Sequence, residues 1–243
     1  TFGLIAALVY ATSPLIIIHE RLAYHTSVIP FLVLLLIYSL LKVINSKAAF
    51  LPIVALCFSL LYNFELATVV FIPVALLVLG IGIYKKEQWI KPIKNRMIIT
   101  LSILGLLIPM IPILIYDFDH GFPQTMKFSA WFVYKGLQVV EFIEKSPGEP
   151  FFELAQFFIN KISLLIFAPN VFVSAIILAV SLVASAIFVL KKKSLFAPLS
   201  IIFLLTIIGI IGFFSAGARS EAYLPMLFPG VILLTAFTIY SLA

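Results

Sequence analysis

Long, continuous apolar runs dominate the chain, separated by short polar turns and one long mixed segment. The runs do not alternate apolar and polar residues at every second position, as the strands of a transmembrane β-barrel do. Their lengths are close to the ~20 residues that a helix needs to cross a bilayer. Eight runs therefore predict membrane-spanning helices: Phe2–Ile18, Ser27–Ile44, Ala48–Tyr62, Leu66–Tyr84, Met97–Tyr116, Val171–Leu190, Leu195–Phe214 and Tyr223–Leu242.

The composition excludes a soluble enzyme and a disordered protein. Of the 243 residues, 63% are hydrophobic and 11% charged, whereas soluble domains are about half apolar and a quarter charged. The sequence predicts an all-α, polytopic transmembrane helical bundle, with membrane lipid as its surroundings. The net charge of +6 does not indicate a nucleic-acid partner, because the basic residues lie between apolar runs. The single cysteine, Cys57, excludes a disulfide framework and a metal–thiolate site.

The distribution of charge predicts the orientation in the membrane. If the His19–Thr26 turn is outside and each run crosses once, ten basic residues face the cytoplasm and six face outward. Nine of the ten acidic residues and all three histidines then lie outside. We therefore expect a multi-pass protein of the cell membrane whose active face is extracytoplasmic. The ten inner cations are Lys42, Lys47, Lys85, Lys86, Lys91, Lys94, Arg96, Lys191, Lys192 and Lys193.

The segment 117–168 is predicted to be a long extracytoplasmic loop that holds interfacial helices. Its Gln124–Glu144 stretch is aromatic and amphipathic. Lys127 and Lys135 are expected to stand at headgroup depth, as anchors of a surface helix or, alternatively, as a cationic lip that attracts a lipid phosphate. Polar residues of Phe151–Phe167 share one helical face, which favours a helix in the outer interface over the alternative, a full crossing. These polar residues are Glu153, Gln156, Asn160 and Ser163.

Two outer turns are expected to be recessed below the membrane surface. The Ala48–Tyr62 run gives only about 22 Å of helix at ~1.5 Å per residue, less than the ~30 Å hydrocarbon core, so Glu65 would lie below the outer surface. The first run is also slightly short, which would place Glu20 and Arg21 below that surface as well. Polar groups at that depth require surrounding protein or a water-filled cavity. The alternative is that the Arg21 and Glu65 side chains reach the interface or form a structural ion pair.

Two further outer segments carry candidate chemistry. The Asp117-Phe118-Asp119-His120-Gly121-Phe122-Pro123 stretch could bind a metal, but a helix end at Gly121 explains it as well, so no metal site is assigned. Arg219, like Arg21, suits bidentate phosphate binding, and internal Arg–Glu pairing is the alternative. The candidate substrate-binding residues are Glu20, Arg21, Tyr24, His25, Glu65, Asp117, His120, Arg219 and Tyr223.

Three segments together resemble the GT-C membrane glycosyltransferases of family 39, which include protein O-mannosyltransferases and aminoarabinose transferases. They are ATSPLIIIHERLAYHTSVIPFLVLLLIYSLLK, IPILIYDFDHGFPQT and AYLPMLFPGVILL. The resemblance implies inverting transfer of a sugar from a polyprenyl-phosphate donor to a lipid, glycan or protein acceptor. It also implies a catalytic aspartate upstream of Thr1, so that residues 1–243 form a single transmembrane domain fragment without the N-terminal helices. Some members carry a second acidic residue a few positions after the arginine. His25 and Thr26 stand near that place in this sequence, so the resemblance gives no second acid here.

Two other functions remain as alternatives. An outer-face polysaccharide polymerase or ligase would carry its catalytic residues in the long loop. A non-enzymatic lipid or glycan transporter would need ionisable residues near the midplane, and the apolar runs have none at their centres. The sequence also lacks nucleotide-binding, serine-hydrolase and zinc-protease motifs. No metal or other cofactor is assigned, and the polyprenyl-phosphate sugar would be the donor substrate.

Overall fold

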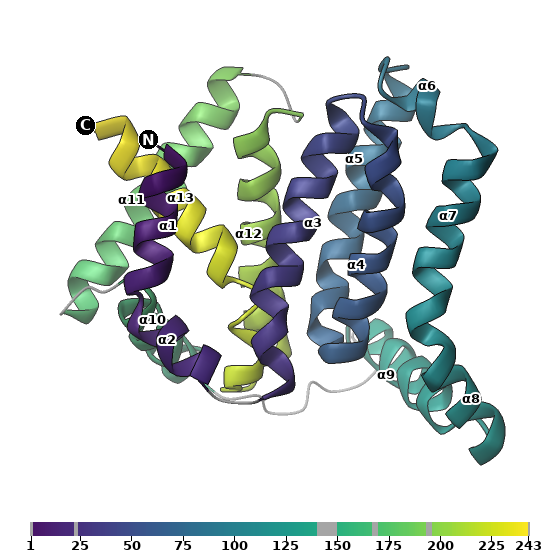
Figure 1. Cartoon of the computed structure of the whole chain (residues 1–243). Helices are drawn as coiled ribbons and strands as arrows, with labels where there is room; N and C mark the ends of the chain where they lie inside the picture. The colour runs from purple at the N-terminus through teal and green to yellow at the C-terminus, as the bar shows by residue number, and fades with distance from the viewer. Residues whose placement is uncertain (1, 22–23, 140–149, 167–169, 193–195, 243) are drawn as a thin grey trace.

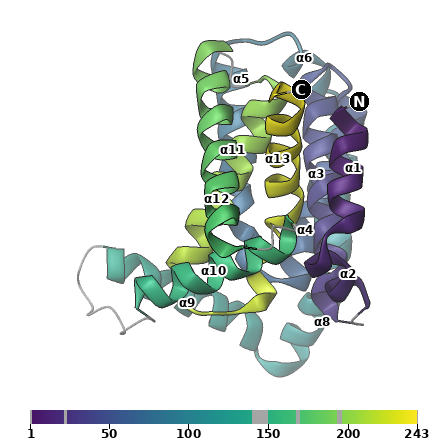
Figure 2. The same cartoon turned by 90° about the vertical axis from the view of Figure 1, so that its left-hand side faces the viewer.

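The computed structural model describes residues 2–21, 24–139, 150–166, 170–192 and 196–242. These residues form helices and turns without a strand, and most of the helices run along one common axis (Figures 1 and 2). This confirms the predicted all-α bundle. The core lies where α3, α4, α12 and the segment before α5 meet, around the buried side chains of Leu36, Leu61, Phe71 and Phe213.

The elements follow one another with short connections. In the first half of the chain they are α1 Phe2–Thr12, α2 Pro14–Arg21, η1 His25–Val28, α3 Ile29–Ile44, η2 Ala48–Phe50, α4 Leu51–Phe64, η3 Leu66–Phe71, α5 Ile72–Tyr84, α6 Ile90–Ile93, α7 Arg96–Leu107, η4 Ile108–Met110 and α8 Ile111–His120. The second half holds α9 Pro123–Val139, α10 Phe151–Leu165, α11 Val171–Lys192, α12 Pro198–Ala216, η5 Glu221–Tyr223 and α13 Phe228–Leu242.

Among the described residues, five helices are long and apolar enough to cross a membrane, and six if the bent pair α1–α2 counts as one span. The other two predicted crossings coincide with the shorter apolar helices Ala48–Phe64 and Phe228–Leu242. Two expected helices are corrected. The first run bends by 61° between α1 and α2 because Pro14 cannot continue the hydrogen-bond ladder. The last run becomes helical only at Phe228, since the proline ring at position 225 interrupts it.

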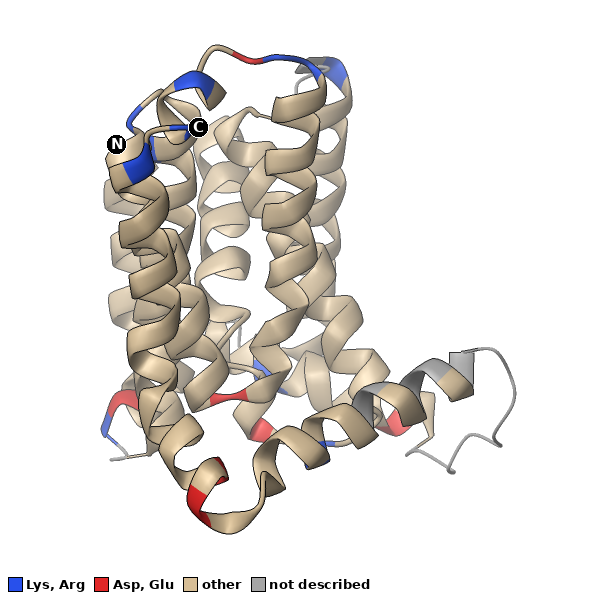
Figure 3. Cartoon of the chain, turned by 90° about the vertical axis from the view of Figure 1, so that its right-hand side faces the viewer, with Lys and Arg blue, Asp and Glu red and all other residues tan. Residues whose placement is uncertain are grey.

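Charged residues separate between the two ends of the bundle, as Figure 3 shows. We call the end with turns 45–47 and 85–95 the basic end, and the end with turns 24–28, 64–66, 117–123 and 217–223 the acidic end. The chain therefore has the charge asymmetry that the sequence predicts for a membrane protein. Lys193, one of the ten expected inner cations, lies outside the described residues.

Helix α10 lies across the acidic end rather than along the bundle axis (Figure 2). It packs on α2 and α11, and it is not among the helices long enough to span. Leu154, Phe158 and Ile162 form its buried face, while Glu153 and Asn160 are exposed. The position agrees with the predicted interfacial helix. Helix α9 also lies at this end, and residues 140–144 of the expected amphipathic stretch lie outside the described residues.

Helices α7 and α8 form the most peripheral span. Helix α7 packs mainly on α4, and no residue in the most apolar stretch of the span is buried. The approach to α4 is close: a Cβ atom on Gly105 would stand 2.8 Å from the carbonyl oxygen of Pro52. Ser59 Oγ also donates a hydrogen bond to the carbonyl oxygen of Leu106 at 2.7 Å. The rest of this span faces the surroundings, which in a membrane protein are lipid.

Candidate functional site

A cleft of about 740 Å³ opens at the acidic end, between the α4–η3 turn and helices α8 and α9. Its volume lies within the ~300–1,000 Å³ of typical ligand sites. The wall combines polar, charged and aromatic side chains at the end of a membrane bundle. The lining residues are Tyr62, Asn63, Phe64, Glu65, Leu66, Pro112, Ile113, Tyr116, Gln124, Lys127 and Phe128.

Glu65 is the carboxylate of the cleft. It links α4 to η3 in an extended conformation, with φ −155°. Its Oε1 accepts a hydrogen bond from the amide of Ala67 at 3.3 Å, and its carbonyl oxygen accepts one from the Thr68 hydroxyl at 2.8 Å. The partly exposed side chain therefore caps η3 and also borders the cleft. The depth of this turn below the membrane surface stays a prediction.

Lys127 is the cation of the cleft, and it belongs to the start of α9. Its side chain is exposed and makes no hydrogen bond or ion pair with the described residues. Gln124 and Phe128 lie beside it, and the Phe128 ring meets the Tyr62 ring edge-on at 6.0 Å. The sequence favours a surface anchor for Lys127, with attraction of a lipid phosphate as the alternative. The spacing of three and four residues from Gln124 to Lys127 and Phe128 marks one helical face and was the available signal.

Asp117 holds the start of α9 in place. This fully buried carboxylate accepts hydrogen bonds from the amides of Gln124 and Thr125 at 2.8 and 2.9 Å, and from the Thr125 hydroxyl at 2.5 Å. Gly121 makes the required left-handed turn with φ 76°, as the helix-end interpretation predicts. Asp117 is therefore a capping residue that positions the start of α9, and with it Lys127, while its role in substrate binding stays a prediction.

His120 lies on the exposed side of the same turn. Its Nδ1 donates a hydrogen bond to the carbonyl oxygen of Tyr116 at 2.9 Å, and the two rings stack at 4.2 Å. His120 does not line the cleft. The described residues contain no group of three His, Cys, Asp or Glu side chains that could hold a metal ion, so Asp117, Asp119 and His120 do not form one.

The segment that joins α2 to α3 is held by local contacts. His19 Nε2 lies 3.1 Å from the Thr26 hydroxyl, and the Tyr10 hydroxyl donates to Glu20 Oε1 at 3.4 Å. Arg21 is exposed and has no side-chain partner among the described residues. The exposed Tyr24 and His25 rings pack on each other at 4.2 Å. None of the candidate residues in this turn, Glu20, Arg21, Tyr24 and His25, lines the cleft.

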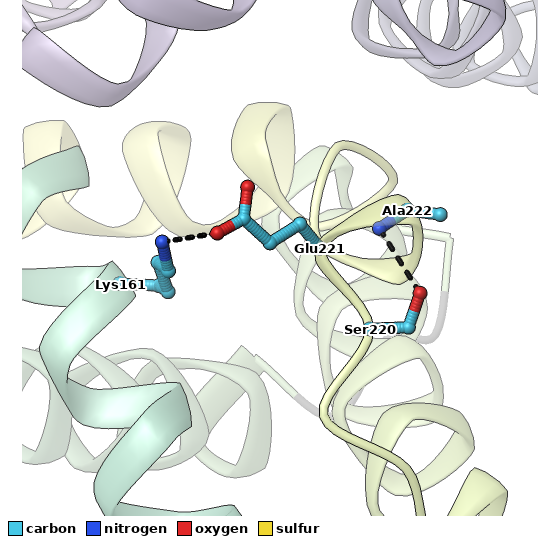
Figure 4. A network of polar contacts seen from close by, with 4 residues as sticks. All are labelled: Lys161, Ser220, Glu221 and Ala222. Atoms are coloured by element: carbon cyan, nitrogen blue, oxygen red, sulfur yellow. Dashed lines mark hydrogen bonds and ion pairs between the residues drawn. The ribbon is translucent and has the colours of Figure 1, made fainter.

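Two ion pairs join α10 to the turn between α12 and α13. Arg219 Nη1 lies 3.3 Å from Glu153 Oε2, and Lys161 Nζ lies 2.5 Å from Glu221 Oε1 (Figure 4 shows the second pair). For Arg219 the structure thus favours internal pairing, with a glutamate distant in sequence. Both pairs are partly exposed, so each stabilises the fold by about 1 kcal/mol at most.

Tyr223 lies in η5, within the turn between α12 and α13. Burial of its side chain, together with the nearby negative charge of Glu65, raises the pKa of Tyr223. Of the nine candidate residues, Glu65 lines the cleft. Comparisons with protein-family models, curated proteins and solved structures find no match to this chain.

Proposed function

We propose that the chain is part of a membrane glycosyltransferase that uses a polyprenyl-phosphate-linked sugar. The cleft at the acidic end carries the proposal, because it presents a carboxylate and a lysine from two different elements, and the lysine has no ion-pair partner within the described part of the chain. A phosphate needs a cation, and sugar hydroxyls need hydrogen-bonding side chains. Lys127 meets the first need, and Glu65 and Gln124 meet the second.

The position of α8 supports a lipid-linked donor over a water-soluble one. Pro112, Ile113 and Tyr116 of α8 form one wall of the cleft. The most apolar stretch of the span to which they belong contains no buried residue. An isoprenoid chain can therefore remain in the bilayer beside α7 and α8 while its phosphate and sugar enter the cleft.

The proposed reaction is a single displacement at the anomeric carbon. The acceptor hydroxyl oxygen attacks that carbon, the bond from carbon to phosphate oxygen breaks, and the configuration inverts. Polyprenyl phosphate leaves with the bonding electrons, and the hydroxyl proton passes to a carboxylate base. Lys127 stabilises the charge that develops on the phosphate. The family resemblance supplies the base from an aspartate upstream of Thr1, and we assign no catalytic base among residues 1–243.

The charge asymmetry supports a site on the extracytoplasmic face of the cell membrane. The basic end would face the cytoplasm by the positive-inside rule, and the cleft lies at the opposite end. A lipid-linked donor on that face would not require the nucleotide-binding motifs that the sequence lacks.

Variants of Lys127 in the complete gene product test the proposed phosphate contact. Membranes are incubated with a panel of polyprenyl-phosphate sugars, and released polyprenyl phosphate is quantified by mass spectrometry. Lys127→Ala should slow release about 100-fold or more, whereas Lys127→Arg should keep most activity because it retains the charge. Lys191→Ala at the basic end is the control, with unchanged activity. Wild-type rates in Lys127→Ala would contradict the role of Lys127.

Arg21→Ala tests the contact that the family resemblance implies. If Arg21 binds the donor phosphate as Lys127 does, this variant should abolish release without lowering expression. Normal turnover in Arg21→Ala would contradict a phosphate contact by Arg21 and leave Lys127 in the cleft as the proposed contact. Absence of release by the wild-type protein with every donor would contradict the proposed function itself.

A further inference from the structure

A strongly basic linker joins α5 to α7 at the basic end, and nothing in the proposed reaction uses it. Residues 85–96 contain five basic side chains and one acidic side chain, Glu87. All five basic side chains are exposed, and none makes an ion pair or hydrogen bond with the described residues. They are Lys85, Lys86, Lys91, Lys94 and Arg96.

Trp89 fixes this linker against the end of the bundle. Its side chain is only 4% exposed, and its ring meets Phe196 edge-on at 5.6 Å. The opposing position on α5 is Gly82, where a Cβ atom would collide with the Trp89 ring. Ile90 is buried as well. The linker is therefore held against the bundle. Its basic side chains stay close to the end of α5 and the start of α7.

The neighbouring turns complete the surface. Helix α6, within the linker, contacts η2, which directly follows the exposed Lys47. Asn95 Oδ1 accepts a hydrogen bond from the amide of Met97 at 2.9 Å and so caps α7. This cap fixes the point at which the linker enters the next span. Figure 3 shows Lys and Arg gathered over this end of the molecule.

We infer that the linker 85–96, together with Lys47, binds the headgroups of anionic phospholipids in the leaflet at the basic end. Clusters of four to eight Lys and Arg directly beside a transmembrane helix attract anionic lipid. These cations make no ion pair with any residue that the structure describes, and two adjoining spans hold them at the membrane surface. The positive-inside rule accounts for their side of the membrane, whereas the buried Trp89 accounts for their fixed position. The inference does not depend on the proposed glycosyltransferase.

Lipid titration of the complete, detergent-purified protein tests the inference. Native mass spectrometry measures the affinities for phosphatidylglycerol and for phosphatidylcholine. The variant Lys85→Gln/Lys86→Gln/Lys91→Gln/Lys94→Gln should bind phosphatidylglycerol about tenfold more weakly. The matched variant with Arg at the same four positions keeps the charge and should bind like the wild type. Affinity for phosphatidylglycerol should also fall with added salt.

Three results would overturn the inference. The first is undiminished phosphatidylglycerol binding by the Gln variant, and the second is an equal loss in the Arg variant, which would exclude charge as the cause. The third is equal wild-type affinity for phosphatidylcholine. Circular dichroism and monodisperse elution establish that both variants are folded before the affinities are compared.

Discussion

At the scale of single residues, Asp117 shows how one buried carboxylate positions a site that it does not enter. Its three hydrogen bonds join the end of α8 to the start of α9, and α9 carries Lys127. Asp117→Asn should destabilise the fold by about 1–3 kcal/mol, because hydrogen bonds to a charged acceptor are lost. Thermal unfolding in detergent measures the change. The nearby exposed Asp119→Asn should change stability by less than about 0.5 kcal/mol, and equal losses in both variants would refute the capping role.

The raised pKa of Tyr223 predicts that the stability of the fold depends on pH in the alkaline range. Burial and the charge of Glu65 raise its pKa above the ordinary 10.0. Above pH 10.0 the unfolded phenol loses its proton while the folded one keeps it, so stability falls as the pH rises through that value. Tyr223→Phe should therefore lose less stability than the wild type when thermal unfolding is compared below and above pH 10.0. The exposed Tyr240→Phe is the control, and identical pH profiles for wild type and Tyr223→Phe would contradict the account.

At the scale of elements, close packing of α4 and α7 holds the peripheral span to the bundle. A Cβ atom at Gly105 would come within 2.8 Å of the Pro52 carbonyl oxygen, and this backbone atom cannot rotate away. Gly105→Ala should therefore destabilise the protein by about 1–3 kcal/mol. At Gly80, in α5, an added Cβ atom would meet nothing within 4 Å, so Gly80→Ala should keep or raise stability. Thermal unfolding of the two alanine variants measures the difference. Equal stability of Gly105→Ala and Gly80→Ala would contradict the close packing of α4 and α7.

The elements also show how far the sequence alone can lead. Apolar length predicts the five long spanning helices and the bent pair α1–α2, whereas two further predicted crossings are shorter helices. The polar stripe predicts the exposed face of α10. The bend at Pro14 and the late start of α13 after Pro225 were missed, because the apolar-length criterion does not register a proline within an apolar run. The cleft was not predictable in the same way, because Glu65 and Lys127 are 62 residues apart in the sequence and belong to different elements. The pairing of Arg219 with Glu153 likewise depends on how α10 crosses the acidic end.

At the scale of the whole molecule, the two ends differ in charge and are proposed to differ in function. The acidic end carries the cleft, and the basic end carries the lipid-binding linker. Both proposals place chemistry at the membrane surface, where a lipid-linked substrate and its headgroup would be found. A bundle that separates its charges in this way should adopt one orientation in the membrane.

Cysteine accessibility tests that orientation. The only cysteine, Cys57, is buried, so a Cys57→Ala background accepts single cysteines at exposed positions. Asp119→Cys at the acidic end should react with a membrane-impermeant maleimide in intact cells. Lys47→Cys at the basic end should react only after the cells are opened. The reverse pattern would place the cleft in the cytoplasm and contradict the proposed extracytoplasmic site.

The central claim is that this protein transfers a sugar from a polyprenyl-phosphate donor, and turnover by the purified wild-type protein tests it most directly. The complete gene product is reconstituted with a panel of polyprenyl-phosphate sugars and an extract of its native membrane as acceptor. The account predicts that polyprenyl phosphate appears in step with sugar attached to a component of the extract. A folded protein that releases no polyprenyl phosphate from any donor would contradict it.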